Sequence, residues 1–288
     1  MPDIWGLAAI LTKLALYIGV MGAAGLVIVQ IAFADLLAPL RVRLRSRVRA
    51  FAALALGAAV LGLLLRGAAL TGDAAGMTDP EMLGLLWQTP VGDALIFRVL
   101  GALTVIAGLY LQATGHWVSL IGGVLLMWSF AQLGHVPELE RTGMRLLLLL
   151  HLAGIAFWIG VLDPLRMLSR QPAQIEQAAL LGEGFGKVAT LAVPALLLAG
   201  LWMAWMLLGG PRALVSTGYG LALLAKLGLV GLVLSLAAAN KLRFVPAMRR
   251  GDAGAARHLA RSIEIETLVI LGVLATTAVL TSVLAVPN

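Results

Sequence analysis

Long apolar runs alternate with short polar connectors along the whole chain. Each run is close to the roughly 20 residues that an α-helix needs to cross the hydrocarbon core of a bilayer. No segment alternates polar and apolar residues in the manner of a membrane β-strand. The pattern predicts an all-α polytopic membrane protein with eight transmembrane helices. The predicted spans are 6–34, 50–70, 94–113, 117–133, 146–167, 188–208, 220–240 and 265–285.

The composition supports this fold class. Hydrophobic residues make up 61% of the 288 residues and charged residues only 12%, whereas soluble domains carry about 25% charged residues. A soluble domain of this composition would lack the polar surface that keeps it in solution. The chain has no Cys, which excludes disulfides, thiolate metal sites and haem attached through cysteine.

The positions of the basic residues predict the orientation. Most of the 21 Lys and Arg residues lie in three connectors, within 41–49, 166–187 and 241–261, while the opposite side has few basic residues and carries seven of the 14 acidic ones. Because basic connectors stay in the cytoplasm, both termini are expected in the periplasm. The net charge of +7 therefore reports topology and attraction to the lipid bilayer, and no binding to nucleic acid is expected.

The two halves of the chain carry a similar pattern. A Thr-x-x-Gly element followed by a buried cation nine residues after the Thr occurs at Thr89 with Arg98 and again at Thr217 with Lys226. With four spans in each half, two repeats would have the same orientation and be related by an axis along the membrane normal. The predicted units are 1–135 and 136–288. Apolar helices also resemble one another by composition alone, and that alternative stays open.

Ionisable side chains within the predicted spans are functional candidates, because charge is costly in hydrocarbon. Lys13, Arg98, His151 and Lys226 lie in one layer near the periplasmic ends of their spans, and no Asp or Glu shares that layer. Two interpretations remain open. The side chains extend outward to the headgroups, or they line an outward-facing pocket that binds an anion.

Two histidines lie in one predicted helical hairpin near the periplasmic face. His135 ends the fourth span and His151 lies in the fifth, and each has a Trp seven residues further inward, Trp128 and Trp158. Seven residues are nearly two helical turns, so each His shares a face with its Trp. Imidazole suits copper, zinc, iron or nickel, although a lone interfacial His more often binds water. The residues near enough in sequence to complete a metal site are Met127, Met144, Glu138 and Glu140.

A series of landmarks gives the chain a family resemblance. They are Gly134-His135, His151, Trp158, Gly160, Tyr219-Gly220, Lys226, Asn240, Pro246, Arg261-Ser262 and Glu266. In their order and spacing they resemble the bacterial copper-resistance protein D (CopD/PcoD) family, most densely over about 183–286. The resemblance implies an inner-membrane protein of eight spans that acts in copper uptake or tolerance. It also implies a periplasmic copper-binding partner of the CopC type, expected here as a separate chain. The family-like histidines are His135 and His151.

We therefore expect a transporter or metal-binding membrane protein rather than an enzyme. Copper would bind at the periplasm-facing histidines and pass inward between the two repeats, although buried cations repel a metal ion at low dielectric. The alternative is a membrane redox protein with haem b, of a quinone- or cupric-reductase-like kind. Lys13, Arg98 and Lys226 would then pair with propionates, and Trp128 and Trp158 would flank the macrocycle. An assembly factor that binds a partner and no metal is a third possibility.

Overall fold

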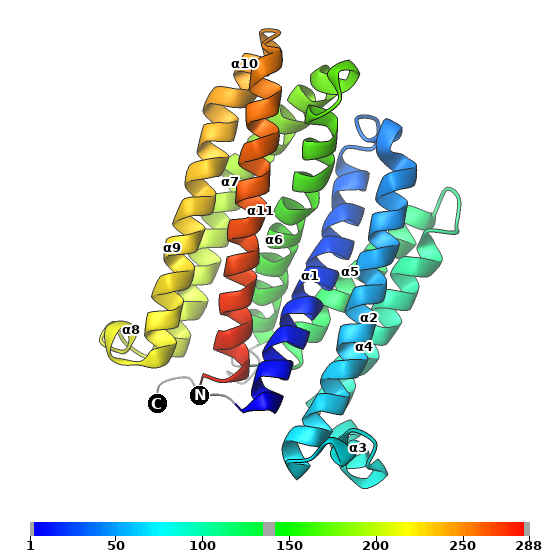
Figure 1. Cartoon of the computed structure of the whole chain (residues 1–288), viewed down its shortest axis with the longest axis vertical. Coiled ribbons are helices and arrows are strands. Elements are labelled where there is room, and N and C mark those ends of the chain that lie inside the picture. The colour runs from blue at the N-terminus through cyan, green and yellow to red at the C-terminus, as the bar shows by residue number, and fades with distance from the viewer. Residues whose placement is uncertain (1–2, 135–141, 285–288) are drawn as a thin grey trace.

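A computed structural model describes residues 3–134 and 142–284, and in these two ranges the chain forms helices and no strand (Figure 1). The α-helices are α1 (Ile4–Ala32), α2 (Arg41–Thr71), α3 (Pro80–Trp87), α4 (Pro90–Gly108), α5 (Gly115–Trp128), α6 (Thr142–Ser169), α7 (Ile175–Leu208), α8 (Ala213–Ser216), α9 (Gly218–Ala239), α10 (Val245–Arg249) and α11 (Ala253–Ser282). The shorter turns are η1 (Ala38–Leu40), η2 (Ala74–Met77), η3 (Ser129–Ala131), η5 (Pro172–Gln174) and the π-helical turn η6 (Asn240–Phe244).

Within the described ranges, seven helical segments are long and apolar enough to cross a membrane. They are Ile4–Ala32, Ala38–Thr71, Pro90–Gly108, Gly143–Ser169, Pro172–Leu208, Gly218–Arg249 and Gly254–Ser282. The segment that corresponds to the fourth predicted span, Gly115–Ala131, is apolar but shorter. The all-helical class is thus confirmed, with seven of the eight predicted spans present at full length.

Three helices begin well before their predicted spans. The sequence pattern placed these starts at 50, 188 and 265, but α2, α7 and α11 begin at Arg41, Ile175 and Ala253. Backbone hydrogen bonding continues through the polar connectors because Arg, Glu and Ala are good helix formers. The 31 residues of α2 span about 46 Å, longer than the roughly 30 Å of hydrocarbon. These helices therefore project beyond the apolar layer.

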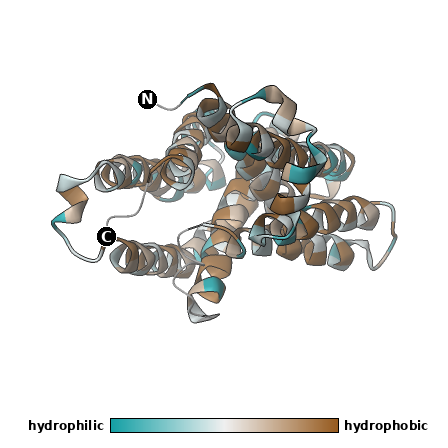
Figure 2. Ribbon diagram, turned by 90° about the horizontal axis from the view of Figure 1, so that it is seen from below, coloured by the Kyte–Doolittle hydropathy of each residue, from teal (hydrophilic) through white to brown (hydrophobic). Residues whose placement is uncertain are grey.

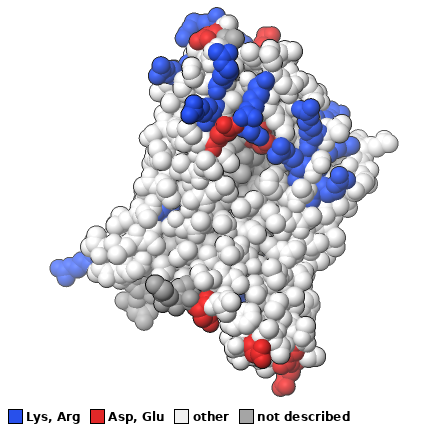
Figure 3. Space-filling model, viewed as in Figure 1, with Lys and Arg blue, Asp and Glu red and all other residues white. Residues whose placement is uncertain are grey.

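Charge is segregated between the two ends of the bundle. Lys and Arg side chains gather at the end that carries α10, while the opposite end shows mostly carboxylates (Figure 3). We call these the basic end and the acidic end. The start of α1 and the end of α11 both lie at the acidic end (Figure 1). Brown, hydrophobic stretches of ribbon occur on helices all around the bundle in a view from that end (Figure 2), and many large hydrophobic side chains, such as Leu191 and Leu268, are exposed, as a lipid-facing surface requires.

The two Thr-x-x-Gly elements have the same local structure. Thr89 is the N-cap of α4 and Thr217 the N-cap of α9, and each hydroxyl accepts a backbone N–H of the first turn, at 3.2 and 3.0 Å. Such caps satisfy N–H groups that the helix leaves unpaired. Gly92 and Gly220 each lie against backbone carbonyls of the preceding turn, with no room for a Cβ. This shared start accounts for the sequence match between the halves.

Helix α1 lies at the centre of the bundle and packs against α2, α5, α6 and α11. Its contact with α6 is a backbone-to-backbone approach at Gly25 and Gly160. A Cβ on Gly25 would lie 2.0 Å from the carbonyl oxygen of Ala156, and one on Gly160 would lie 2.2 Å from the carbonyl carbon of Gly25. Small residues at such crossings let membrane helices pack closely. The α1–α6 contact therefore holds the two halves of the chain together.

The two halves differ in whether their four helices pack into a closed ring. In the first-half bundle (α1, α2, α4 and α5), each helix packs on the next and α5 returns to α1. In the second-half bundle (α6, α7, α9 and α11), α6 packs on α7 and α11, and α11 packs on α9. Along their described lengths α7 and α9 do not pack on each other as α2 and α4 do. The second-half bundle is thus an open arrangement.

Candidate functional site

His151 lies on α6 at its contact with α7. Its ring lies over Gly200, where a Cβ would be 3.2 Å from the ring atom Cε1, so the missing side chain makes room for the imidazole. The Nδ1 atom is buried and makes no hydrogen bond of good geometry among the described residues, although the backbone of Leu196 on α7 lies beside the imidazole as a polar neighbour. Lys226 of α9 is a charged neighbour of the ring. An imidazole nitrogen without a partner is chemically able to bind a metal ion.

The other predicted metal ligands do not gather around this ring in the part of the chain that the structure describes. His135 lies outside the described residues, so its pairing with His151 stays a prediction. Met144 is buried on α6, about 10 Å nearer the acidic end by helical rise. Met127 is buried in the main hydrophobic core, where methionine commonly fills gaps. Trp128 ends α5 and is half-buried.

Trp158 has a specific polar partner that the sequence pattern did not reveal. Its indole Nε1–H donates to Oε1 of Glu266 on α11 at 2.6 Å. The amide Nδ2 of Asn240, the first residue of η6, donates to the other carboxylate oxygen, Oε2, at 2.9 Å. Glu266 is only 1% exposed, and within the described residues no cation forms an ion pair with it. A carboxylate thus joins α6, α11 and the end of α9.

A cavity of about 310 Å³ adjoins this carboxylate. Its walls come from α6, α7, the last turns of α9, η6, α10 and α11, so it fills the space that α7 and α9 leave between them. Pro194 of α7 lines it and has no N–H to offer the carbonyl of Thr190, one turn earlier. Lys241 donates to the Thr190 hydroxyl at the same wall. No Met or His side chain is among the described residues that line the cavity.

A cluster of cationic side chains lies in the first-half bundle. The Lys13 amine donates to the carbonyl oxygen of Thr281 on α11 at 2.5 Å. Arg98 donates from Nε to the hydroxyl of Ser129 at 3.2 Å, and Arg66 is a charged neighbour of both cations. None of the three has an ion-pair partner in the described ranges. Lys13 and Arg98 of the predicted layer are therefore neighbours, and Arg66, a residue outside that predicted layer, lies beside them.

Ion pairs tie the helices together at the basic end. Asp163 of α6 pairs with Arg47 of α2 at 3.1 Å and with Arg166 at 3.8 Å. Glu264 of α11 pairs with Arg166 at 3.3 Å and also with Arg170. These contacts link α2, α6 and α11 at the basic end. They therefore hold α6, which carries Trp158, next to α11, which carries Glu266.

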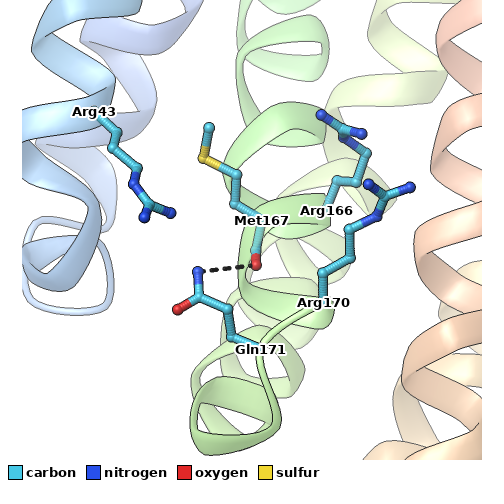
Figure 4. Close-up of a pocket in the computed structure, with 5 residues that line it drawn as sticks. All are labelled: Arg43, Arg166, Met167, Arg170 and Gln171. Atoms are coloured by element: carbon cyan, nitrogen blue, oxygen red, sulfur yellow. Dashed lines mark hydrogen bonds between the residues drawn. The ribbon is translucent and has the colours of Figure 1, made fainter.

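A shallow basic pocket of about 470 Å³ lies beside these ion pairs, between α2 and α6 (Figure 4). Arg43 extends into it from α2, and Gln171 donates to the backbone carbonyl of Met167 across its floor at 3.3 Å. Arg166 and Arg170 point toward α11, where their carboxylate partner lies. Basic pockets of this kind suit anionic lipid headgroups, but two of these three guanidinium groups already pair with carboxylates.

The fold and these sites define a multi-pass helical membrane protein with charged and polar side chains buried between its helices. The chain belongs to the copper resistance protein D family. The family model described as Copper resistance protein D matches residues 179–280, and the model described as Copper resistance protein D-like, N-terminal domain, matches residues 1–140. The resemblance expected over about 183–286 is confirmed, and the first half matches the family as well.

Two relatives agree with this assignment. Copper resistance protein D of Pseudomonas syringae pv. tomato is 29% identical over 257 residues, which cover 80% of this chain and 82% of the relative. Copper transport protein CutJ of Bacillus subtilis (strain 168) is 29% identical over 217 residues, or 70% of this chain. The matched region spans only 38% of CutJ. No solved structure matches the chain significantly.

Proposed function

We propose that this protein binds copper at a periplasm-facing histidine site in the bacterial inner membrane and carries it across the membrane. The observation that carries the proposal is the buried, unpartnered Nδ1 of His151, in a chain of the copper resistance protein D family. Burying a polar atom without a partner costs free energy, and a bound copper ion would compensate it. His135 and His151 would be the principal ligands.

The proposed path runs through the second-half bundle. Lys13 and Arg98, both half-buried, and the more exposed Arg66 lie in the first-half bundle, where they oppose the entry of a metal ion. The second-half bundle offers His151, the space between α7 and α9, and the carboxylate of Glu266. Lys226 beside His151 weakens copper binding there, which favours release over storage.

The basic end would face the cytoplasm and the acidic end the periplasm. The matching caps of α4 and α9 support two same-orientation repeats of four helices. In this orientation the exposed carboxylates of the acidic end face the compartment from which a CopC-type protein would deliver copper. That partner comes from the family resemblance and requires its own test.

Copper binding by purified protein tests the histidine site. The full-length chain and the variants His135→Ala and His151→Ala are loaded with copper, and the bound copper per chain is measured. Each substitution is expected to remove the outer copper ion. His116→Ala is the matched control, because His116 is exposed on α5. Unchanged copper binding in both histidine variants contradicts the proposal.

An absorption spectrum of the same samples distinguishes the copper proposal from the alternative of a haem b redox protein. The copper proposal predicts no Soret band in protein purified from cells supplied with haem. A Soret band that shifts on reduction, and that disappears in His151→Ala, would overturn the proposal in favour of a haem b protein.

Orientation can be measured directly because the chain has no Cys. Ser216→Cys lies at the acidic end and Ser46→Cys at the basic end, and both serines are exposed. A membrane-impermeant maleimide applied to intact spheroplasts should label Ser216→Cys and should label Ser46→Cys only after lysis. The reverse pattern contradicts the proposed orientation.

A further inference from the structure

We infer that Glu266 and Asn240 form a proton-exchange site, where the Glu266 carboxyl takes up a proton from the basic end and releases it when copper enters the second-half bundle. The coupling to copper rests on the proposed function, whereas the proton site itself does not. Asn240 is the first residue of the π-helical turn η6. Single π-helical turns inside longer helices occur frequently at functional sites.

The Glu266 carboxyl has no counter-charge among the described residues. It is 1% exposed and lies within the membrane-spanning segment Gly254–Ser282. A charge in such a place is costly unless it is paired, and a buried carboxyl without a cation is neutralised by a proton. Lys241 is the other ionisable residue of the described cavity lining, but its amine donates to Thr190.

The other ionisable groups on the surrounding helices lie away from this carboxyl. Those of the basic end form ion pairs or are exposed, and the rest lie toward the acidic end. The ion-paired residues are Asp163, Arg166, Arg170, Glu183, Lys187, Arg249 and Glu264. The exposed residues are Glu176, Arg243, Arg257, His258 and Arg261, and those toward the acidic end are Lys13, Tyr17, Arg145, His151, Tyr219 and Lys226.

Asn240 is able to satisfy the carboxyl in both of its protonation states. In the ionised state, the Trp158 indole donates to Oε1 at 2.6 Å and Nδ2 of Asn240 donates to Oε2 at 2.9 Å. The Oδ1 atom of Asn240 is then buried without a partner in the described ranges. When Oε2 gains a proton, rotation of the amide places Oδ1 where it accepts the new O–H. Trp158 keeps its acceptor in both states.

A path for the proton leads from this carboxyl to the basic end. Glu266 and Asn240 line the cavity of about 310 Å³, and two other lining residues, Thr190 and Lys241, are exposed. Ser262 lies one turn nearer the basic end on α11, and its buried hydroxyl has no partner within the described residues. Residues four apart share a helix face, and a hydroxyl both donates and accepts. Ser262 is therefore suited to pass on the proton.

Copper at the proposed histidine site interacts electrostatically with this carboxyl. His151 precedes Trp158 by seven residues on α6, about 10 Å by helical rise, and the Trp158 indole is bonded to Glu266. Charges interact over such a distance when the dielectric is low. Bound copper therefore favours the ionised carboxyl, and by reciprocity a protonated carboxyl weakens copper binding. Copper entry expels the proton, and its return from the basic end promotes copper release.

The variant Glu266→Gln imitates the protonated state. Its carbonyl accepts from Trp158, and its amide donates to Oδ1 of the rotated Asn240. The fold should therefore survive while the proton site is lost. Glu264→Gln is the matched control, because it makes the same change on the same helix at an ion-paired position of the basic end. Asn240→Leu is a second variant, which keeps the carboxyl and removes its amide partner.

Infrared difference spectra of the purified full-length chain, recorded between high and low pH, test the proton site. We expect a C=O band of a protonated carboxyl that grows as the pH falls. The band should be absent from Glu266→Gln, present in Glu264→Gln and shifted to higher frequency in Asn240→Leu, where its hydrogen bond is missing. If Glu266→Gln retains every carboxyl band of the wild type, or if Asn240→Leu shifts none, the proton site is overturned.

Copper loading in weakly buffered solution tests the coupling. We expect the wild type and Glu264→Gln to release protons that Glu266→Gln does not release, and the wild-type carboxyl band to shrink. Equal proton release by the wild type and Glu266→Gln, with copper bound to both, overturns the coupling and leaves the histidine site intact. A wild-type chain that binds no copper overturns the proposed function together with the coupling, and the infrared band then decides the proton site alone.

Discussion

The two four-helix halves of this protein use similar helix starts to build different interiors. In the first-half bundle, α2 and α4 pack on each other and close the ring, and the half-buried cations Lys13 and Arg98 lie among these helices. In the second-half bundle, α7 and α9 stay apart, and the space between them holds a cavity with a buried carboxylate at its wall. In the proposed function, the first half is the scaffold and the second half is the binding unit.

The contact between the halves gives the largest expected effect on stability. In Gly160→Ala the new Cβ would lie 2.2 Å from the backbone of Gly25, which cannot move away as a side chain can. We expect a loss of about 3 kcal/mol, the upper part of the range for overpacking, seen as a lower apparent Tm in detergent. Gly57→Ala is the control, because nothing lies within 4 Å of a Cβ there. Equal stability of the two variants would show that α1 and α6 do not depend on this approach.

The hydrogen bonds of Glu266 in the second-half bundle should give the next largest effect on stability. Glu266→Ala leaves the N–H groups of Trp158 and Asn240 buried without an acceptor. We expect a loss of about 2 kcal/mol, against little change in Glu266→Gln. The two apparent Tm values should therefore differ clearly. If Ala and Gln are equally tolerated, the carboxylate does not hold α6 and α11 together.

The ion pairs of the basic end should contribute less. Asp163→Asn weakens the link from α6 to Arg47 of α2. Because both side chains are partly exposed, we expect a loss of no more than about 1 kcal/mol. The loss should shrink in about 1 M salt, where screening is strong. A double-mutant cycle with Arg47→Gln measures the pair directly. A coupling energy that does not change with salt would contradict the description of Asp163 and Arg47 as a partly exposed ion pair.

The smallest effect is expected at the exposed carboxylate of α7. Glu183 pairs with Lys187 at 2.9 Å on its own helix and with Arg249 at 3.7 Å. Exposed pairs of this kind contribute little because water and salt screen them. Glu183→Gln should therefore leave the apparent Tm and copper binding unchanged. A clear loss of stability would indicate that α7 is fixed at the basic end by this contact.

The sequence predicts the helices better than the site. Long apolar runs and their length locate the long helices, and the Thr-x-x-Gly elements mark the starts of α4 and α9. The lone histidine His151 is also visible as a polar residue within an apolar span. These features are local, so they can be read without knowledge of which helices meet.

Glu266 was among the family landmarks, yet its role was not predicted from sequence. The apolar pattern starts the last span at 265, which makes Glu266 an interfacial residue, but α11 begins 12 residues earlier and buries it. Its partners are 108 and 26 residues away in the chain. Such contacts depend on how α6, α9 and α11 are arranged. The available signal was a carboxylate at the start of the apolar part of α11, opposite in charge to the cations within the other spans.

Uptake of radioactive copper by proteoliposomes tests the central claim most directly, namely that copper crosses through the second-half bundle. The account predicts uptake by the wild-type chain and by His116→Ala, whose exposed residue lies on α5 of the first-half bundle. It predicts strongly reduced uptake by His151→Ala and by Glu266→Gln, with all four proteins folded and equally incorporated. Wild-type rates of uptake in both second-half variants would contradict it.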